Sequence, residues 1–180
     1  MKNITKIIEY ITFLAILMLL FIPATIQAQD TMKHQHHQMH DSTLSQRQQM
    51  IHSRSHMVMP FDMNRVTHYF IKKDNGGVLM IKAKDQEDTA QISLIRSHLT
   101  KENSMFSQGN FRDPAALHGA NMPGIKTLAE TKDRYQVKYT EIPAGAKLTF
   151  TSKDTAVINA LHIWFDAQLK DHGKDAKSKK

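Results

Sequence analysis

The sequence predicts an α+β fold. We expect two ββα units to form an antiparallel four-stranded sheet with two helices on one face, preceded by a disordered arm rich in His and Met. Twice along the chain, two strand-like segments joined by a short turn precede a long segment with helical spacing. The two long segments share an Asp-Thr-Ala start, at Asp88 and Asp154, and apolar residues coincide at the helical turns that follow. Since a hairpin alone is only marginally stable, the units should pair and bury one core.

The first unit begins at Phe61. Residues 65–73 (RVTHYFIKK) and 78–84 (VLMIKAK) are typical of strands, and the intervening DNGG is typical of a tight turn. In the helix that follows, we expect Asp85 to cap the start and Gly109 to mark the end. Its apolar residues at helical spacing are Ile92, Ile95, Leu99 and Phe106.

An insertion at about residues 108–131 separates the two units. Asp113 and the proline after it open a short helix, because proline suits the first helical position, and Gly119 ends it. A second short helix is expected at about 125–130. The second unit then repeats the order of the first: RYQVKYTEI and AKLTFTS are strands joined by the turn PAG, and DTAVINALHIWFDAQLKDHG is a helix closed by Gly173.

Residues 1–28 have the pattern of a signal peptide. Lysines precede the apolar run ITFLAILMLLFI, which is shorter than the roughly 20 residues that a membrane-spanning helix needs. Small residues around Ala28 fit a cleavage site. An uncleaved segment is the alternative and the only membrane attachment that we expect. The chain has no cysteine, which excludes disulfides and a lipid-modified cysteine. We therefore expect an exported protein, periplasmic or secreted.

The rest of the chain divides into three parts. Residues 29–60 show no hydrophobic period and are expected to form the disordered arm. Residues 61–173 should form the ββαββα domain, and residues 174–180 a basic tail. The formal net charge is +7, but the lysines have no interleaved aromatic residues on which bases could stack. We therefore expect no nucleic-acid partner, and the sequence does not indicate an oligomeric state.

The arm is dense in side chains that bind copper. Thioethers and imidazoles suit Cu(I), and imidazole also suits Cu(II), zinc and nickel. Six histidines and six methionines fall within residues 32–63, which favours copper over zinc or nickel. The alternative is a polar linker of biased composition. The candidate metal ligands in this segment are His34, His36, His37, Met39, His40, His52, His56, Met57 and Met59.

The folded part offers further candidate ligands. The repeat sets the helices of His98 and His162 side by side, and the loop with His118 could close over them. Each histidine also has an ordinary structural explanation, as a boundary residue or as one of a pair four residues apart. The sequence has no G-x-S-x-G elbow, H-E-x-x-H motif or P-loop, so it favours a protein that is not an enzyme. The candidates here are His68, His98, His118, Met122, His162 and His172.

The chain also resembles a small family of secreted bacterial proteins of unknown function. The resemblance covers about Met59 to Gly173 and is carried by MPFDMNRVTHYF, DPAALHGANMPG, IPAGAKLTF and ALHIWFDAQLKDHG. It implies that the histidines at the positions of His68, His98, His118, His162 and His172 recur. Some members are labelled aspartate carbamoyltransferase, but this chain is too short for that two-domain enzyme and lacks its S-T-R-T phosphate loop.

Together these features predict an exported metal-handling protein, for which copper is favoured. The arm would capture the ion and the core histidines would hold or pass it, with a copper exporter or oxidase as the partner. The alternative is a small ligand-binding module, or an uncharacterised enzyme, in which the arm is incidental.

Overall fold

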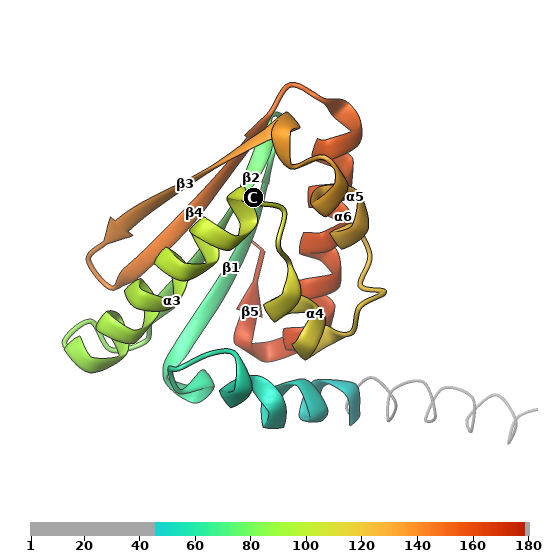
Figure 1. The fold of residues 1–180 in the computed structure, drawn as a ribbon. Coiled ribbons are helices and arrows are strands. Elements are labelled where there is room, and N and C mark those ends of the chain that lie inside the picture. The colour runs from blue at the N-terminus through green and yellow to red at the C-terminus, as the bar shows by residue number, and fades with distance from the viewer. Residues whose placement is uncertain (1–45, 179–180) are drawn as a thin grey trace, which may run out of the picture. The chain divides into compact units, whose positions relative to one another are not determined.

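The computed structural model describes residues 46–178 (Figure 1). Contacts along the chain divide it into residues 1–43 and 44–180, and everything described belongs to the second unit. The predicted signal peptide and the part of the predicted arm before residue 46 lie outside the described residues.

The fold is α+β, as predicted, but the predicted four-stranded antiparallel sheet is wrong. The sheet is mixed and has five strands in the order β3-β4-β2-β1-β5. The first four strands pair antiparallel, whereas β5 runs parallel to β1 at the edge. A strand of two residues shows no alternation, so the sequence pattern did not indicate β5. The strands are β1 (Val66–Lys73), β2 (Gly76–Ala83), β3 (Tyr135–Ile142), β4 (Gly145–Ser152) and β5 (Ala176–Lys177).

The two predicted hairpins meet at the centre of the sheet. Strands β2 and β4 pair there, with Leu79 opposite Leu148. Gly76 makes this junction possible: it has a φ of 143°, and a Cβ at this position would lie 2.1 Å from the carbonyl oxygen of Phe150. The predicted pairing of two ββα units is therefore present, with β5 as an addition.

Two long helices, α3 (Thr89–Ser107) and α6 (Thr155–His172), pack on one face of the sheet (Figure 1). Their N-caps are Asp88 and Asp154, whose carboxylates accept hydrogen bonds from backbone N–H groups of the first turn. The predicted cap Asp85 is wrong, because its carboxylate instead accepts a hydrogen bond from Glu87 N in the preceding turn. The true caps are thus the aspartates of the two Asp-Thr-Ala segments.

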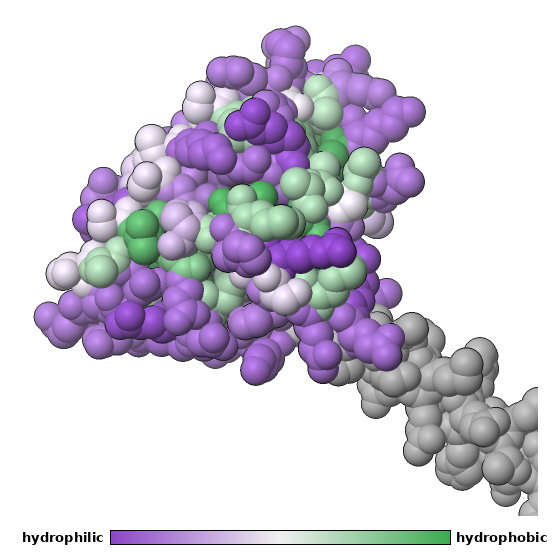
Figure 2. Space-filling view, turned by 60° about the horizontal axis from the view of Figure 1, so that its bottom comes forward, coloured by the Kyte–Doolittle hydropathy of each residue, from purple (hydrophilic) through white to green (hydrophobic). Residues whose placement is uncertain are grey.

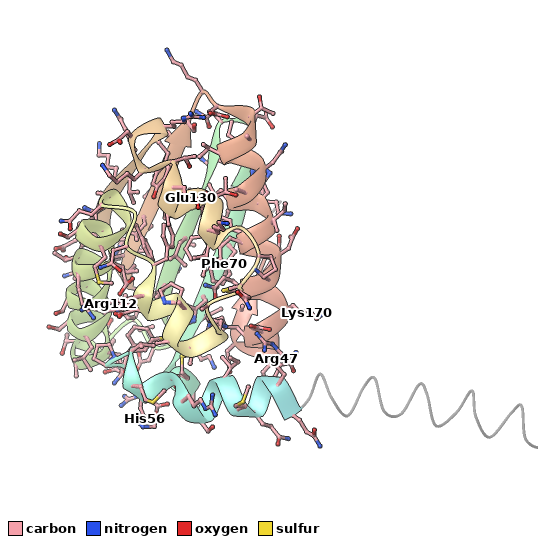
Figure 3. All side chains as sticks on the ribbon, turned by 45° about the vertical axis from the view of Figure 1, so that its right-hand side comes forward. Arg47, His56, Phe70, Arg112, Glu130 and Lys170 are labelled. Atoms are coloured by element: carbon pink, nitrogen blue, oxygen red, sulfur yellow. The ribbon has the colours of Figure 1, made fainter. Side chains whose placement is uncertain are left out.

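The core lies between these helices and the sheet. Trp164 and Phe165 on α6 are fully buried, and Figure 3 shows Phe70 in the interior. The ring centroids of Phe70 and Phe165 are 5.4 Å apart. Gly77 of β2 lies against Phe165, where a Cβ would be only 2.6 Å from the ring. The sheet and helix α6 therefore approach as closely as this glycine allows.

The segment between the two units contains two short helices, as predicted. These are α4 (Arg112–His118) and α5 (Ile125–Glu130), with Gly119 ending the first. Gly124 has a φ of 84° and lies so close to α6 that a Cβ would be 2.2 Å from Ala160 O. The inserted segment is therefore packed onto helix α6.

Residues 46–60 are ordered, and the prediction of disorder is wrong for this part of the arm. Residues 46–54 are helical and continue into η1 (Ser55–Met57). Ile51 is 1% exposed, and Met59 is also buried. A few separated apolar anchors hold this segment, and such sparse anchors leave no hydrophobic period in the sequence.

The remaining short elements flank the strands. They are η2 (Met63–Arg65), η3 (Lys132–Arg134) and η4 (Gly173–Asp175). The predicted basic tail is therefore part of the fold as far as the end of β5.

The surface in Figure 2 is mostly hydrophilic, with a group of hydrophobic residues near the centre of the face shown. The large hydrophobic side chains exposed within residues 46–178 are Met50, Met57 and Ile163. No helix in this range combines the length and the apolar character needed to cross a membrane.

Candidate histidine cavity

A cavity of about 60 Å³ lies between helices α3 and α6, above strands β1 and β2. Phe70, Leu79 and Ile81 form part of its apolar wall, and Met59 also lines it. A volume of this size has room for about four water molecules. The polar part of the lining is His68, His98, Glu102, Asp113, His118, Trp164, Gln168 and His172.

The two long helices contribute matching stripes to this cavity. Residues four apart lie on one face of a helix, and each helix presents three such residues. The offset that aligns the two N-caps, Asp88 and Asp154, also aligns the two stripes residue by residue. The cavity therefore lies at the interface between the two repeats. The stripes are His98, Glu102 and Phe106 on α3, and Trp164, Gln168 and His172 on α6.

Three of the histidines are in ring contact. The rings of His68 and His172 stack with centroids 4.8 Å apart, and His118 meets His172 edge-on at 5.1 Å. All three side chains are buried. His98 lies further along the cavity wall, with its ring edge-on to Phe61 at 5.4 Å. The cluster thus joins strand β1, helix α4 and the end of helix α6.

A buried carboxylate fixes the orientation of His118. Its Nδ1 lies 2.9 Å from Oδ2 of Asp171, and Arg47 donates to both oxygens of the same carboxylate, at 2.6 and 2.5 Å. Burial would raise the pKa of Asp171, but the hydrogen bonds from His118 and Arg47 lower it to about 2. With Asp171 ionised, its carboxylate can only accept, so Nδ1 of His118 donates to it. Figure 3 shows Arg47 on the helix of residues 46–54, near Lys170 at the end of α6.

His68 is uncharged at neutral pH. Burial lowers its pKa to about 3, helped by repulsion from His98 and His118 and opposed by a hydrogen bond to the backbone of Asp175. Nδ1 of His68 is buried and has no hydrogen-bond partner. One ring nitrogen is thus held by the backbone while the other has no partner, as in many metal-binding histidines.

The other two cavity histidines with perturbed pKa values are also neutral. Burial, followed by repulsion from His68 and His118, lowers the pKa of His172 well below its ordinary value. Burial, followed by repulsion from Lys101, lowers the pKa of His98 to about 4. Neutral imidazole is the form that binds metal ions, so protons compete little for these rings at neutral pH.

Glu102 and Asp113 form a carboxyl pair beside His98. Burial raises the pKa of Glu102 to about 8, and the hydrogen bond and negative charge of Asp113 act in the same direction. When Glu102 is ionised, neither of its oxygens has a donor. When it is protonated, it can donate to Asp113, whose carboxylate also binds Lys101 at 2.5 Å. The cavity therefore contains a carboxylic acid that stays protonated at neutral pH.

Five of the predicted metal ligands line this cavity. They come from separate segments of the chain and had no common spacing: Met59, His68, His98, His118 and His172.

The other predicted ligands lie elsewhere. His162 points to the β1–β2 turn, where Nε2 lies 2.8 Å from Gly76 O and 3.1 Å from Lys73 O. Met122 is part of the hydrophobic core. His52 contacts a carboxylate oxygen of Asp175 at 3.2 Å, His56 contacts the backbone oxygen of Ser53 at 2.9 Å, and Met57 is exposed. The candidates outside the described residues are His34, His36, His37, Met39 and His40.

The sequence reasoning missed Trp164 and Gln168 as cavity residues. The signal that could have found them is the repeat itself, because its offset aligns Glu102 with Gln168 and His98 with Trp164.

As the side chains stand, no group of three or more His, Asp or Glu within residues 46–178 is placed to hold a metal ion. An ion in the cavity would therefore require the rings to turn. The donor chemistry nevertheless fits, because neutral imidazoles and a thioether share one cavity.

Comparisons of the chain with protein-family models, curated proteins and solved structures give no match. The function is therefore inferred from the chemistry of the cavity.

Proposed function

We propose that this protein is exported and that it binds and hands on a metal ion, copper in preference to zinc or nickel, through the histidine cavity and the His/Met arm. The observation that supports the proposal best is that five ligands expected from the sequence line a single buried cavity. Histidines with unrelated structural roles would have no reason to line the same cavity.

The surroundings of the rings support the same conclusion. Metal-binding histidines usually have the second ring nitrogen bound to a carboxylate or a backbone carbonyl, which fixes the ring and its tautomer. His118 has this arrangement with Asp171, and His68 has a backbone partner at Asp175. Met59 adds a thioether to the lining, and a mixed imidazole and thioether set favours copper.

Residues 46–60, the described end of the arm, connect the predicted ion-capturing segment to the histidine cavity. Val58 and Met59 line the cavity, and Arg47 binds Asp171, the carboxylate that orients His118. In the proposal, the His/Met segment before residue 46 collects the ion and the cavity histidines receive it. A periplasmic copper exporter or oxidase would then take the ion from the cavity.

The test uses the only tryptophan of the chain, Trp164, as a reporter, because it lines the cavity. Bound Cu(II) quenches the fluorescence of a nearby indole. We expect saturable quenching by Cu(II) in the mature chain, and its loss in the double variant His68→Phe/His118→Gln. The matched control is His162→Gln, which removes a histidine outside the cavity.

A second arm of the experiment separates the cavity from the arm. A chain that begins at residue 46 lacks the five candidate ligands outside the described residues but keeps Ile51 and Met59, which pack on the domain. We expect it to bind fewer ions and to retain the quenching of Trp164. Quenching that is equal in the cavity double variant and the control, or that disappears with residues 29–45 alone, would overturn the proposal.

A further inference from the structure

Several buried polar groups around the cavity lack a hydrogen-bond partner. Six described residues have such a side-chain atom, and four of them line the cavity. The four groups are Nδ1 of His68, the carboxyl oxygens of Glu102, Nε1 of Trp164 and Oε1 of Gln168. The carboxyl of Glu102 can donate to Asp113, which leaves three groups without a partner. Buried polar groups without partners are uncommon in folded proteins, so three around one cavity indicate that a partner is missing.

A metal ion alone cannot supply that partner. The indole N–H of Trp164 is only a donor and needs an acceptor, which a cation does not offer. An ammonium ion fails for the same reason. Trp164 is 0% exposed, so bulk water does not reach it.

An anion fits poorly as well. Oε1 of Gln168 and Nδ1 of His68 need donors, which a bare carboxylate or phosphate does not have. The Asp113 carboxylate also lines the cavity and would repel a negative charge. Lys101 lies 2.5 Å from Asp113 and is already paired with it.

We propose that the cavity binds a small neutral molecule of the primary amide class, with one acceptor and two donor hydrogens on adjacent atoms. Its carbonyl oxygen would accept from Nε1 of Trp164, and its amide hydrogens would reach Oε1 of Gln168 and Nδ1 of His68. A cavity of about 60 Å³ limits the occupant to about four non-hydrogen atoms, the size of acetamide.

Nothing in this assignment requires a metal ion, because it rests on the unpartnered groups of the cavity. The experiment therefore uses the mature chain with a chelator present. If copper does not bind, the proposal of an amide site is unaffected. If the amide does not bind, the proposal of copper binding is unaffected. Each measurement therefore tests one proposal only.

The experiment follows the indole N–H of Trp164, which gives a single resonance in a spectrum of ¹⁵N-labelled protein because the chain has one tryptophan. Acetamide is the probe, and acetate and methylammonium are the anion and cation controls. A ligand of four non-hydrogen atoms binds with a Kd of about 40 μM at best. We expect a saturable shift with acetamide at millimolar concentration and none with either control.

Matched variants connect the shift to the cavity. Gln168→Met removes the side-chain amide at similar length, and we expect acetamide binding to weaken at least about tenfold, which is the loss of one hydrogen bond in a buried site. The control is Gln136→Met on strand β3, where the glutamine is exposed. If Gln168→Met does not fold, His68→Phe removes the second acceptor and should weaken binding in the same way.

Three results would overturn the proposal. No saturable shift with acetamide means that the cavity holds water only. An equal shift with acetate means that it accepts anions. Equal affinity in the Gln168→Met and Gln136→Met proteins means that the probe binds elsewhere.

Discussion

Lowering the pH from 7 to 5 tests whether the fold buries His68 in its neutral form. The ring is 3% exposed and stacks against His172, and its pKa is about 3 against an ordinary value of 6.5. Because the pKa is lower in the folded state, the unfolded chain binds the proton first as the pH falls. The stability that neutral His68 contributes is therefore complete above pH 6.5 and is lost progressively between pH 6.5 and about 3.

The magnitude follows from these values. A pH of 5 is about 1.5 pH units below the pKa of 6.5 that His68 has in the unfolded chain. Protonation of the unfolded chain therefore lowers the unfolding free energy by about 2 kcal/mol. His98, with a pKa of about 4, acts in the same direction. Glu102 acts in the opposite direction: its pKa is raised from 4.5 to about 8, so its contribution is complete below pH 4.5 and is lost as the pH rises towards 8.

Since these groups oppose one another, the assay compares two proteins. Urea unfolding at pH 7 and pH 5, at equal ionic strength, gives the change in unfolding free energy for the wild type and for His68→Phe. Phenylalanine keeps an aromatic ring in the stack but cannot bind a proton. We expect acidification to cost the wild type about 2 kcal/mol more than the variant. An identical pH dependence in both proteins would refute the assignment of His68 as a buried neutral group.

Three further changes test other parts of the structure. Arg47→Ala should lower the unfolding free energy, measured in urea, by about 1 to 2 kcal/mol. The change removes two charge-assisted hydrogen bonds from the buried carboxylate of Asp171, while the arginine itself is partly exposed. An unchanged unfolding free energy would mean that Arg47 does not hold the helix of residues 46–54. In thermal unfolding, Gly124→Ala should lower the Tm more than Gly119→Ala does. Both glycines have a positive φ, but only at Gly124 would a Cβ lie 2.2 Å from a backbone atom. An equal fall in Tm would contradict the close packing at Gly124. Glu102→Gln should remove the loss of stability between pH 4.5 and 8, because the amide does not ionise. Urea unfolding across that pH range measures the loss. If it is the same in the variant and the wild type, Glu102 is not the cause.

Much of the fold follows from local patterns in the sequence. Alternation and turn residues predicted both hairpins, and Gly119 and Gly173 ended the helices where expected. The repeat of Asp-Thr-Ala predicted the equivalence of α3 and α6. These features depend on neighbouring residues, which a single sequence contains.

Other parts of the fold depend on distant contacts that leave little local pattern. Strand β5 exists because Ala176 reaches the edge of β1 opposite His68, and two residues show no period. The helix of residues 46–54 is held by Ile51, by Arg47 on Asp171, and by packing against the end of α6. Its polar composition resembled a disordered segment.

The cavity, like the fold, was predicted from the sequence only in part. His98 and His118 were expected to converge and do line one cavity. His162 was grouped with them because it lies on the matching helix, but it falls outside the stripe of Trp164 and Gln168 and instead contacts the β1–β2 turn. His162 precedes Trp164 by two positions, which turns its side chain about 200° around the helix, and the offset of the repeat aligns His98 with Trp164 rather than with His162.

The most direct test of metal binding in the cavity is anomalous X-ray scattering at the copper edge from crystals of residues 29–180 grown with copper. We expect an anomalous peak inside the cavity, within coordination distance of at least two nitrogen atoms of His68, His118 and His172. Well-occupied copper found only outside the cavity, with His68 still stacked on His172 and His118 still edge-on to His172, would contradict the proposal.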